Sequence, residues 1–148
     1  MSIAKRGRIT LLALLLTAFS MQAVSAAETA QLVLRSQQGM VSGYLHDGTR
    51  IVLGRVISHL SHTAFHLWGD AQHSDTRPTA YFLTGSQDSR HQLRVRLESD
   101  NGYADDKSGG GLILPTINDE ASFYLVIDGD QNVIADSYSF GFAAATTP

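Results

Sequence analysis

The sequence predicts an all-β fold, and we expect a sandwich of two sheets. Apolar and polar residues alternate with period two along most of the chain, and turn-forming residues separate the alternating segments. After residue 26 no convincing stretch shows the 3.6-residue apolar periodicity of a helix. A sandwich is therefore the favoured architecture, and a closed barrel is the structural alternative.

Seven segments carry the strand pattern. They are Ala30–Ser36, Arg50–Ser58, Thr63–Gly69, Thr79–Thr84, Gln92–Ser99, Ala121–Asp128 and Val133–Ala144. In most of them every second residue is apolar, which gives one core face and one solvent face. Which side of segment 50–58 faces the core stays undecided, because its apolar residues occur at both odd and even positions. Cover on both sides or a bulge near Gly54 would explain that pattern.

Turn-forming residues lie between these segments. Asp47-Gly48, residues 85–88 and Asp128-Gly129-Asp130 each separate two apolar runs, so we expect several hairpins. The longest segment without a strand or helix pattern is Asp100–Gly111, which is polar and rich in glycine. It is predicted to be a mobile surface loop.

Residues 1–26 have the three parts of a secretory signal peptide. A basic start is followed by an apolar run from Ile9 to Phe19 and by small residues up to Ala26, where signal peptidase would cut. A membrane anchor is the alternative, but a spanning helix needs roughly 20 apolar residues. We expect export, cleavage after Ala26 and a single mature domain over 27–148.

Composition narrows the function further. Residues 1–26 hold three of the eleven Lys and Arg and none of the fourteen acids, so the mature chain carries a formal charge of −6. An acidic domain without basic runs has no footprint for nucleic acid or anionic lipid. The chain contains no cysteine, which excludes thiol chemistry, cysteine metal sites and disulfides.

The predicted strands form most of an immunoglobulin-like sandwich, a fold that normally closes with one more strand. After Ala144 only four residues remain, too few to turn and run back. We therefore predict an incomplete sandwich that lacks its final strand and has an open apolar groove. The candidate groove residues, which share one side of the first or last strand, are Leu32, Leu34, Tyr138, Phe140, Phe142 and Ala144.

An open groove has an energetic consequence. About five alternate side chains filling it, at roughly 1.5–3 kcal/mol each, would contribute about 8–15 kcal/mol gross, comparable to the net stability of a domain. The chain alone should be marginally stable or aggregation-prone through its open edge. Tyr138, near the start of the last strand, either ties down the adjoining corner through its hydroxyl or simply packs in the core.

Two stretches carry a resemblance to a known family. They are Leu45–Trp68, LHDGTRIVLGRVISHLSHTAFHLW, and Asp88–Leu97, DSRHQLRVRL. The chain resembles the Afa/Dr-type invasin tip subunits and, among such proteins, the tip subunits of Saf-type atypical fimbriae. The resemblance covers nearly the whole mature chain, and its most specific marks are Asp47-Gly48, Gly54-Arg55, His62-Thr63, Phe65-His66 and Trp68.

The resemblance implies an incomplete pilin that is folded by a periplasmic pilus chaperone and passed to an outer-membrane usher. A shaft pilin would then complete it on the cell surface with its N-terminal donor strand. Only Ala27-Glu28-Thr29 precede the first predicted strand, so this subunit is expected to accept a strand without donating one and to end the fibre. It would be a fimbrium-tip adhesin or invasin with an unknown host receptor.

Two departures from the family pattern are visible. Invasins of this group commonly join the second and last strands by a disulfide, and the matching positions here are Ser58 and Thr146. Loss of a disulfide removes about 2–4 kcal/mol and increases dependence on the donor strand. The resemblance suggests an integrin as receptor, but the chain contains no Arg-Gly-Asp triplet.

Other binding chemistry remains as alternatives. Arg94 and Arg96 are candidates for a cationic receptor contact, with Trp68 or Tyr103 as aromatic contacts. The alternative is a solvated face without a binding role. His62 and His66, predicted to share one side of a strand, suggest a metal site, but such positions lie roughly 13 Å apart. Asp128-Gly129-Asp130 lacks the rest of a calcium loop.

No nucleophile motif or ordered Ser, His and Asp set is present, so we expect no enzyme activity, no cofactor and no metal. Three hypotheses stay open. The first is a fimbrial tip adhesin that accepts a donor strand, the second a free-standing periplasmic metal-binding sandwich, and the third a fibre cap without adhesive activity.

Overall fold

The computed structural model describes residues 5–12, 21–25, 30–36, 43–106 and 110–148 of the chain, and every regular element among them is a β-strand. The strands are β1 (Lys5–Leu12), β2 (Met21–Ser25), β3 (Gln31–Ser36), β4 (Gly43–Leu45), β5 (Arg50–Ile57), β6 (Ala64–Gly69), β7 (Gln72–His73), β8 (Ala80–Thr84), β9 (Gln92–Glu98), β10 (Tyr103–Ala104), β11 (Leu112–Pro115), β12 (Glu120–Ile127), β13 (Gln131–Val133) and β14 (Ser137–Thr147). Within these ranges no helix is long and apolar enough to span a bilayer.

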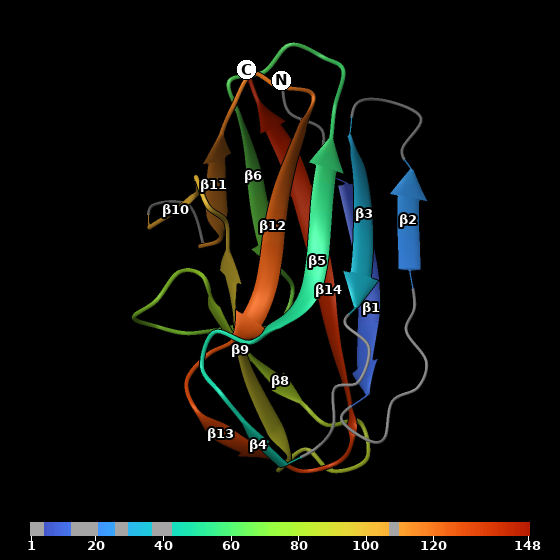
Figure 1. The fold of residues 1–148 in the computed structure, drawn as a ribbon, viewed down its shortest axis with the longest axis vertical. Helices are drawn as coiled ribbons and strands as arrows, with labels where there is room; N and C mark the ends of the chain where they lie inside the picture. The colour runs from blue at the N-terminus through green and yellow to red at the C-terminus, as the bar shows by residue number, and fades with distance from the viewer. Residues whose placement is uncertain (1–4, 13–20, 26–29, 37–42, 107–109) are drawn as a thin grey trace.

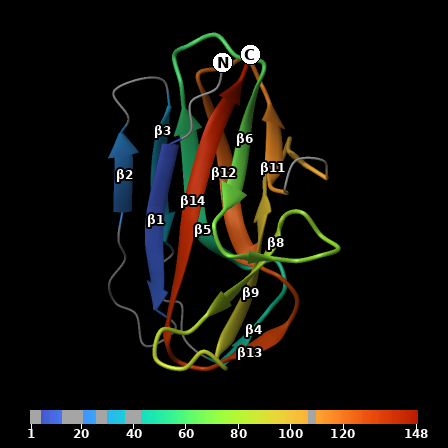
Figure 2. The ribbon, with the colours of Figure 1, turned by 180° about the vertical axis from the view of Figure 1, so that it is seen from behind.

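Two open sheets pack face to face and form the predicted sandwich. The five-stranded sheet has the order β1-β14-β6-β11-β10, and the seven-stranded sheet has the order β2-β3-β5-β12-β9-β8-β7. Figure 1 shows β3, β5 and β12 in front, and Figure 2 shows β1, β14 and β6 from the other side. A small two-stranded sheet, β13-β4, lies at the end opposite the C-terminus. Neither large sheet closes into a barrel.

The six predicted strands before residue 130 each match an observed strand to within one residue at either end. The last predicted segment, Val133–Ala144, is instead two strands, because a turn separates β13 from β14. The predicted turns at Asp47-Gly48 and Asp128-Gly129-Asp130 connect β4 to β5 and β12 to β13. Gly48 has a φ of 83°, a conformation that glycine adopts without steric cost.

The strand of uncertain facing, β5, contains the bulge that resolves it. Its register against β12 shifts between Leu125 and Val126, so that Arg50 pairs with Val126 and Ile51 has no partner. Ile51 and Val52 therefore both turn inward and are buried. We expected a bulge near Gly54, and it lies three residues before that glycine, at Ile51. At Gly54 itself an added Cβ would overlap the Phe123 ring, so the glycine serves close packing.

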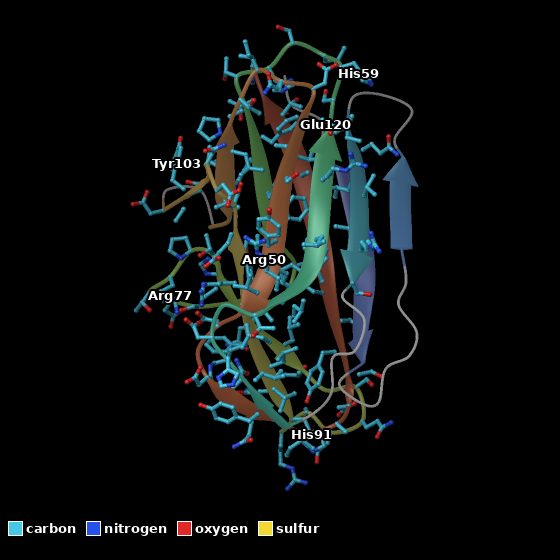
Figure 3. All side chains as sticks on the ribbon, in the orientation of Figure 1. Arg50, His59, Arg77, His91, Tyr103 and Glu120 are labelled. Carbon is cyan, nitrogen blue, oxygen red and sulfur yellow. The ribbon has the colours of Figure 1, made fainter. Side chains whose placement is uncertain are left out.

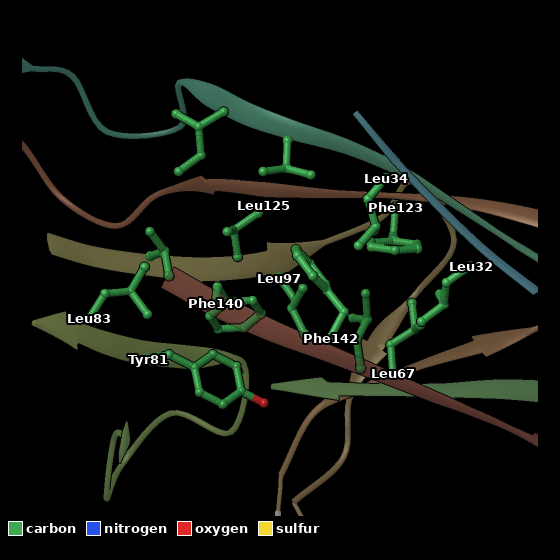
Figure 4. Packing of buried hydrophobic residues seen from close by; sticks show 14 of the residues in the cluster. Leu32, Leu34, Leu67, Tyr81, Leu83, Leu97, Phe123, Leu125, Phe140 and Phe142 are labelled. Carbon is green, nitrogen blue, oxygen red and sulfur yellow. The ribbon is translucent and has the colours of Figure 1, made fainter. Parts of the chain in front are cut away.

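The core lies between the two large sheets. The alternating residues predicted to face inward from β9 and β12 are all buried, namely Leu93, Val95, Leu97, Phe123, Leu125 and Ile127. They belong to the same apolar cluster as the inward residues of β3 and β14. Figure 4 shows the rings of Phe140 and Phe142 from β14 among these side chains.

The sequence analysis did not predict the short strands. β4, β7, β10, β11 and β13 have two to four residues each, too few to show a period-two pattern. β10 lies inside the segment 100–111 that we predicted to be a loop, and it pairs with β11. Residues 107–109 of that segment lie outside the described residues.

Candidate functional site

β14 places four of the six predicted groove residues on the core side of the five-stranded sheet. Tyr138, Phe140, Phe142 and Ala144 alternate along this strand, and each is at most 1% exposed. The Phe140 and Phe142 rings meet edge to face with their centroids 4.7 Å apart. Such aromatic pairs add to the stabilisation that burial itself provides.

The other two groove residues come from the opposite sheet. Leu32 and Leu34 on β3 are fully buried and belong to the same cluster as the four β14 residues. β3 and β14 are each the last strand before an edge strand of their sheets, β2 and β1 respectively. The structure thus brings all six predicted residues together, along one side of the sandwich.

That side is covered by strands that come from the predicted signal peptide. β1 pairs antiparallel with β14 over eight residue pairs, from Lys5 opposite Ala144 to Leu12 opposite Ser137. β2 pairs antiparallel with β3 over five residue pairs. In Figure 2, β1 runs alongside β14 at the edge of the sheet. An extended segment of about eight residues therefore fits beside β14, where the final strand of an immunoglobulin-like sandwich belongs.

Tyr138 fixes the N-terminal end of β14. Its hydroxyl donates a hydrogen bond of 2.6 Å to the backbone carbonyl of Ile134, four residues upstream, which is the corner arrangement considered from the sequence. Burial, and then the nearby Asp136 carboxylate, raise the pKa of this hydroxyl. The hydroxyl therefore stays protonated and holds the turn before the strand.

Two of the predicted receptor-contact residues lie on the seven-stranded sheet and two on the other. Arg94 and Arg96 point outward from β9, because the residues between and beside them are buried. Trp68 on β6 and Tyr103 on β10 belong to the five-stranded sheet. Tyr103 is 58% exposed, and Figure 3 shows it at the β10 side of the molecule. The structure does not bring the four residues together in one patch.

Arg96 is occupied by acidic neighbours. Its guanidinium contacts Asp47 at 2.6 Å, Glu98 at 2.7 Å and Asp128 at 3.0 Å. Burial alone would lower the pKa of this guanidinium, but the hydrogen bonds to the three carboxylates outweigh burial and raise it. Arg96 therefore holds the β4–β5 and β12–β13 turns together, and its side chain has little capacity left for a receptor.

The acidic turn proposed as a calcium alternative is satisfied by the protein itself. Asp128 also contacts Arg77 at 2.8 Å. Asp130 accepts hydrogen bonds from the Tyr44 hydroxyl at 3.0 Å and from the Asp47 backbone N–H at 2.8 Å. These contacts are those of a structural turn, as the sequence favoured.

The histidines do not assemble as the metal hypothesis requires. His62 lies before β6 rather than on it, and its ring nitrogens are 2.7 Å and 2.8 Å from the carbonyls of Leu60 and Asn118. His66 points outward, and its ring packs against the Trp68 ring with the two centroids 4.8 Å apart. Their predicted shared face is therefore wrong, because the strand begins only at Ala64. Among the described residues, no three His, Asp or Glu side chains form a metal-binding group.

The two positions that match the family disulfide are both inside the protein. Ser58 is 1% exposed and Thr146 6% exposed. The Ser58 backbone N–H donates to the Asp119 carbonyl at 2.7 Å, and Thr146 pairs with Phe65 in the β14–β6 ladder. Backbone hydrogen bonds therefore hold both segments without a covalent link.

Residues that the sequence analysis missed cluster on the outer face of the seven-stranded sheet. Arg35 on β3, Arg55 on β5 and Tyr124 on β12 line a hollow of about 400 Å3 together with apolar residues. Arg50 places its guanidinium carbon 3.7 Å from the centre of the Tyr124 ring. The alternation in β3 predicts that Arg35 points outward. In β5 the bulge lies between Arg50 and Arg55, so both point outward although they are five residues apart, and simple alternation predicts this for only one of them.

The fold and the β14 side together define a class of proteins, the immunoglobulin-like subunits of fimbriae and related surface adhesins. Among solved structures, the Salmonella SafD adhesin matches with 40% identity and a TM-score of 0.77, covering 81% of this chain and 86% of its own. A structure from enteroaggregative Escherichia coli AAF fimbriae, described with fibronectin binding and biofilm formation, matches with 27% identity and a TM-score of 0.71, covering 78% and 86%.

Sequence comparison gives the family. Protein AfaD of Escherichia coli is 35% identical over 146 residues, which cover 97% of this chain and 94% of that protein. A family model described as the Enterobacteria AfaD invasin protein matches residues 41–144. The chain belongs to the AfaD invasin family. The solved structures described above are those of an adhesin and of a fimbrial protein.

Proposed function

We propose that the chain is a fimbrial tip adhesin whose six groove residues receive a donor strand from a neighbouring pilin. The observation that carries the proposal is β1. Its eight residue pairs with β14 come from a segment that we expect signal peptidase to remove. Cleavage after Ala26 would take away β1 and β2 and leave the edges of β14 and β3 without partners.

The chemistry of that edge suits strand addition. The backbone N–H and C=O groups along β14 would give affinity, and the pockets beside Tyr138, Phe140 and Phe142 would select alternate side chains of the incoming strand. Only four residues, 27–30, lie between the expected cleavage site and the start of β3 at Gln31, so the mature chain would accept a strand and donate none. Such a subunit would end a fibre.

The same proposal gives the route and the partners. The leader would direct export to the periplasm, where a pilus chaperone would shield the open edge and an outer-membrane usher would pass the subunit to the surface. A shaft pilin would then supply the donor strand through its N-terminal extension. The tip position places the subunit where a host-cell receptor is met, and membership of the invasin family supports an adhesive role.

The test compares thermal unfolding of residues 27–148 alone with the same chain fused, through a flexible linker after Pro148, to a shaft pilin's N-terminal extension. A fusion that carries the linker alone is the control. We expect a large rise in Tm only with the extension, because about 8–15 kcal/mol of apolar burial is restored. An unfused chain that is already stable and monomeric, with a Tm that the extension leaves unchanged, would show that the fold closes itself.

Adhesion is tested separately from strand acceptance. Deletion of the tip subunit should leave fibres assembled but reduce binding of the bacteria to host cells. Fibres that still bind at full strength would favour the fibre cap without adhesive activity. Fibres that fail to form would indicate a role in starting assembly.

A further inference from the structure

The outer face of the seven-stranded sheet holds most of the positive charge of the domain. Five of the eight Lys and Arg residues after residue 26 point outward from β3, β5 and β9. They are Arg35, Arg50, Arg55, Arg94 and Arg96. Carboxylates share this face, since Arg96 contacts Asp47, Glu98 and Asp128, and Arg55 contacts Glu120. The arginines relevant to a ligand are therefore those that line or border the hollow described next, Arg35, Arg50 and Arg55.

A hollow lies on this outer face, between β3, β5 and β12. Val33, Leu53 and Tyr124 give it an apolar lining, and Ser122 adds one hydroxyl. The guanidinium side chains of Arg35 and Arg55 line the same hollow. Its volume of about 400 Å3 falls in the range of small-molecule sites.

Two contacts shape the hollow. Arg50 lies over the Tyr124 ring at 3.7 Å, which restrains the ring as part of the lining. Arg55 contacts Glu120 at 3.2 Å, but the two side chains are 51% and 54% exposed. An ion pair so exposed contributes little and exchanges readily with an incoming carboxylate. Figure 3 shows Arg50 and Glu120 on the same face of the molecule.

We propose that this hollow binds a carboxylated sugar unit. Guanidinium groups recognise carboxylates through paired hydrogen bonds, and an apolar lining with an aromatic ring suits the C–H face of a sugar ring. The volume accommodates one ring-sized body rather than an extended chain. An acidic side chain of a peptide would supply the carboxylate but leave the apolar lining uncovered, so the sugar is the better fit.

The proposal goes beyond strand acceptance and does not depend on it, because the hollow faces outward while the groove residues face the core. The test therefore uses the chain fused to its donor strand, which is folded whether or not the strand is needed. Amide NMR spectra are recorded while methyl β-glucuronide is added, and separately methyl β-glucoside, which has the same ring without the carboxylate.

We expect glucuronide to shift the amide signals of Leu53, Ser122 and Tyr124, and glucoside to bind at least about tenfold more weakly. Arg35→Gln and Arg55→Gln should each weaken glucuronide binding by a similar factor. Arg90→Gln is the matched control, because it removes one positive charge from an exposed side chain outside the hollow.

Several results would overturn the proposal. Equal binding of the two glycosides would show that the carboxylate is not recognised. Equal loss in the Arg90→Gln control would indicate a general charge effect, and shifts that map to other residues would place the ligand elsewhere. Absence of shifts with glucuronide, or preferential binding of a short acidic peptide at the same hollow, would exclude a sugar site.

Discussion

At the residue scale, Asp136 organises the turn that precedes β14. Its side chain has no solvent exposure, and its carboxylate accepts hydrogen bonds from the backbone N–H groups of Ser137 at 2.6 Å and Gln87 at 3.1 Å. His91 adds a contact of 2.9 Å between its Nδ1 and the carboxylate. One buried carboxylate thus ties the β8–β9 turn to the start of β14.

These contacts predict an acid sensitivity. Burial alone would raise the pKa of Asp136, but the hydrogen bonds from His91 and from backbone N–H groups outweigh burial and lower the pKa to about 2. The unfolded chain titrates near the ordinary value of about 3.9. The stabilisation is therefore fully present above about pH 4 and is lost as the pH falls toward 2.

Asp136→Asn should lower stability at pH 7 and flatten the loss of stability between about pH 4 and pH 2. Denaturant unfolding of the strand-complemented protein at a series of pH values measures both effects. Asp75→Asn, on an exposed loop residue, serves as the control and should change neither. An acid limb that is equally steep in Asp136→Asn would assign the sensitivity to other carboxylates.

Tyr138→Phe isolates the corner hydrogen bond. The change keeps the buried ring and removes the donor to the Ile134 carbonyl, so we expect a loss of about 1–2 kcal/mol in the free energy of unfolding. Denaturant titration measures it, and Tyr103→Phe on the exposed β10 ring should be neutral. A neutral Tyr138→Phe would mean that packing alone positions this residue.

At the element scale, the long strands were predictable and the short ones were not. Segments such as β9 and β12 repeat an inward residue three or four times, which fixes both their type and their facing. β10 and β13 have two and three residues, so tertiary pairing rather than local pattern defines them. The bulge in β5 reverses the parity at Ile51, which no alternation rule could reveal.

The candidate sites divide in the same way. The groove residues on β3 and β14 were found because each strand presents them at every second position. The hollow was missed because its lining comes from three strands that are distant in sequence, and only their pairing places Val33, Leu53 and Tyr124 together. Trp68 and Arg94 were grouped by residue type, although their strands lie in different sheets.

The β1–β14 register predicts which donor positions matter. Ile9 pairs with Phe140 and Leu11 with Tyr138, whereas Thr10 pairs with Ser139. Opposite residues of an antiparallel pair share a face of the sheet, so donor positions aligned with Phe140 and Tyr138 should face the core.

In a fused donor strand, Asp at the position aligned with Phe140 should abolish most of the gain in Tm, because a charge would enter an apolar core. Asp at the position aligned with Ser139 is the control and should be tolerated, since Ser139 is exposed. Thermal unfolding distinguishes the two. The reverse pattern would mean that a donor strand enters with a register shifted by one residue.

At the scale of the whole molecule, the two proposed functions use opposite faces of the seven-stranded sheet. The groove residues Leu32 and Leu34 face the core, whereas the hollow lies on the outer face. A subunit held in a fibre through β14, as we propose, would therefore keep the hollow accessible.

The open edge also predicts a change in oligomeric state. Residues 27–148 without a donor strand should associate with increasing concentration, because the unpaired edge of β14 can pair with another copy. The strand-fused chain should remain monomeric. Sedimentation velocity over a range of concentrations compares the two, and a monomeric unfused chain at every concentration would contradict an exposed edge.

The opposite margins of the two sheets end in strands of only two residues. β10 is the last strand of the five-stranded sheet and β7 that of the seven-stranded sheet. So short a strand offers too few backbone groups for another chain to add to it stably. Once the leader is removed, one side of the sandwich would have strand edges that can pair with another strand, and the opposite side would not. Under the proposed function, a donor strand would join from that side alone, and the fibre would stay linear rather than branched.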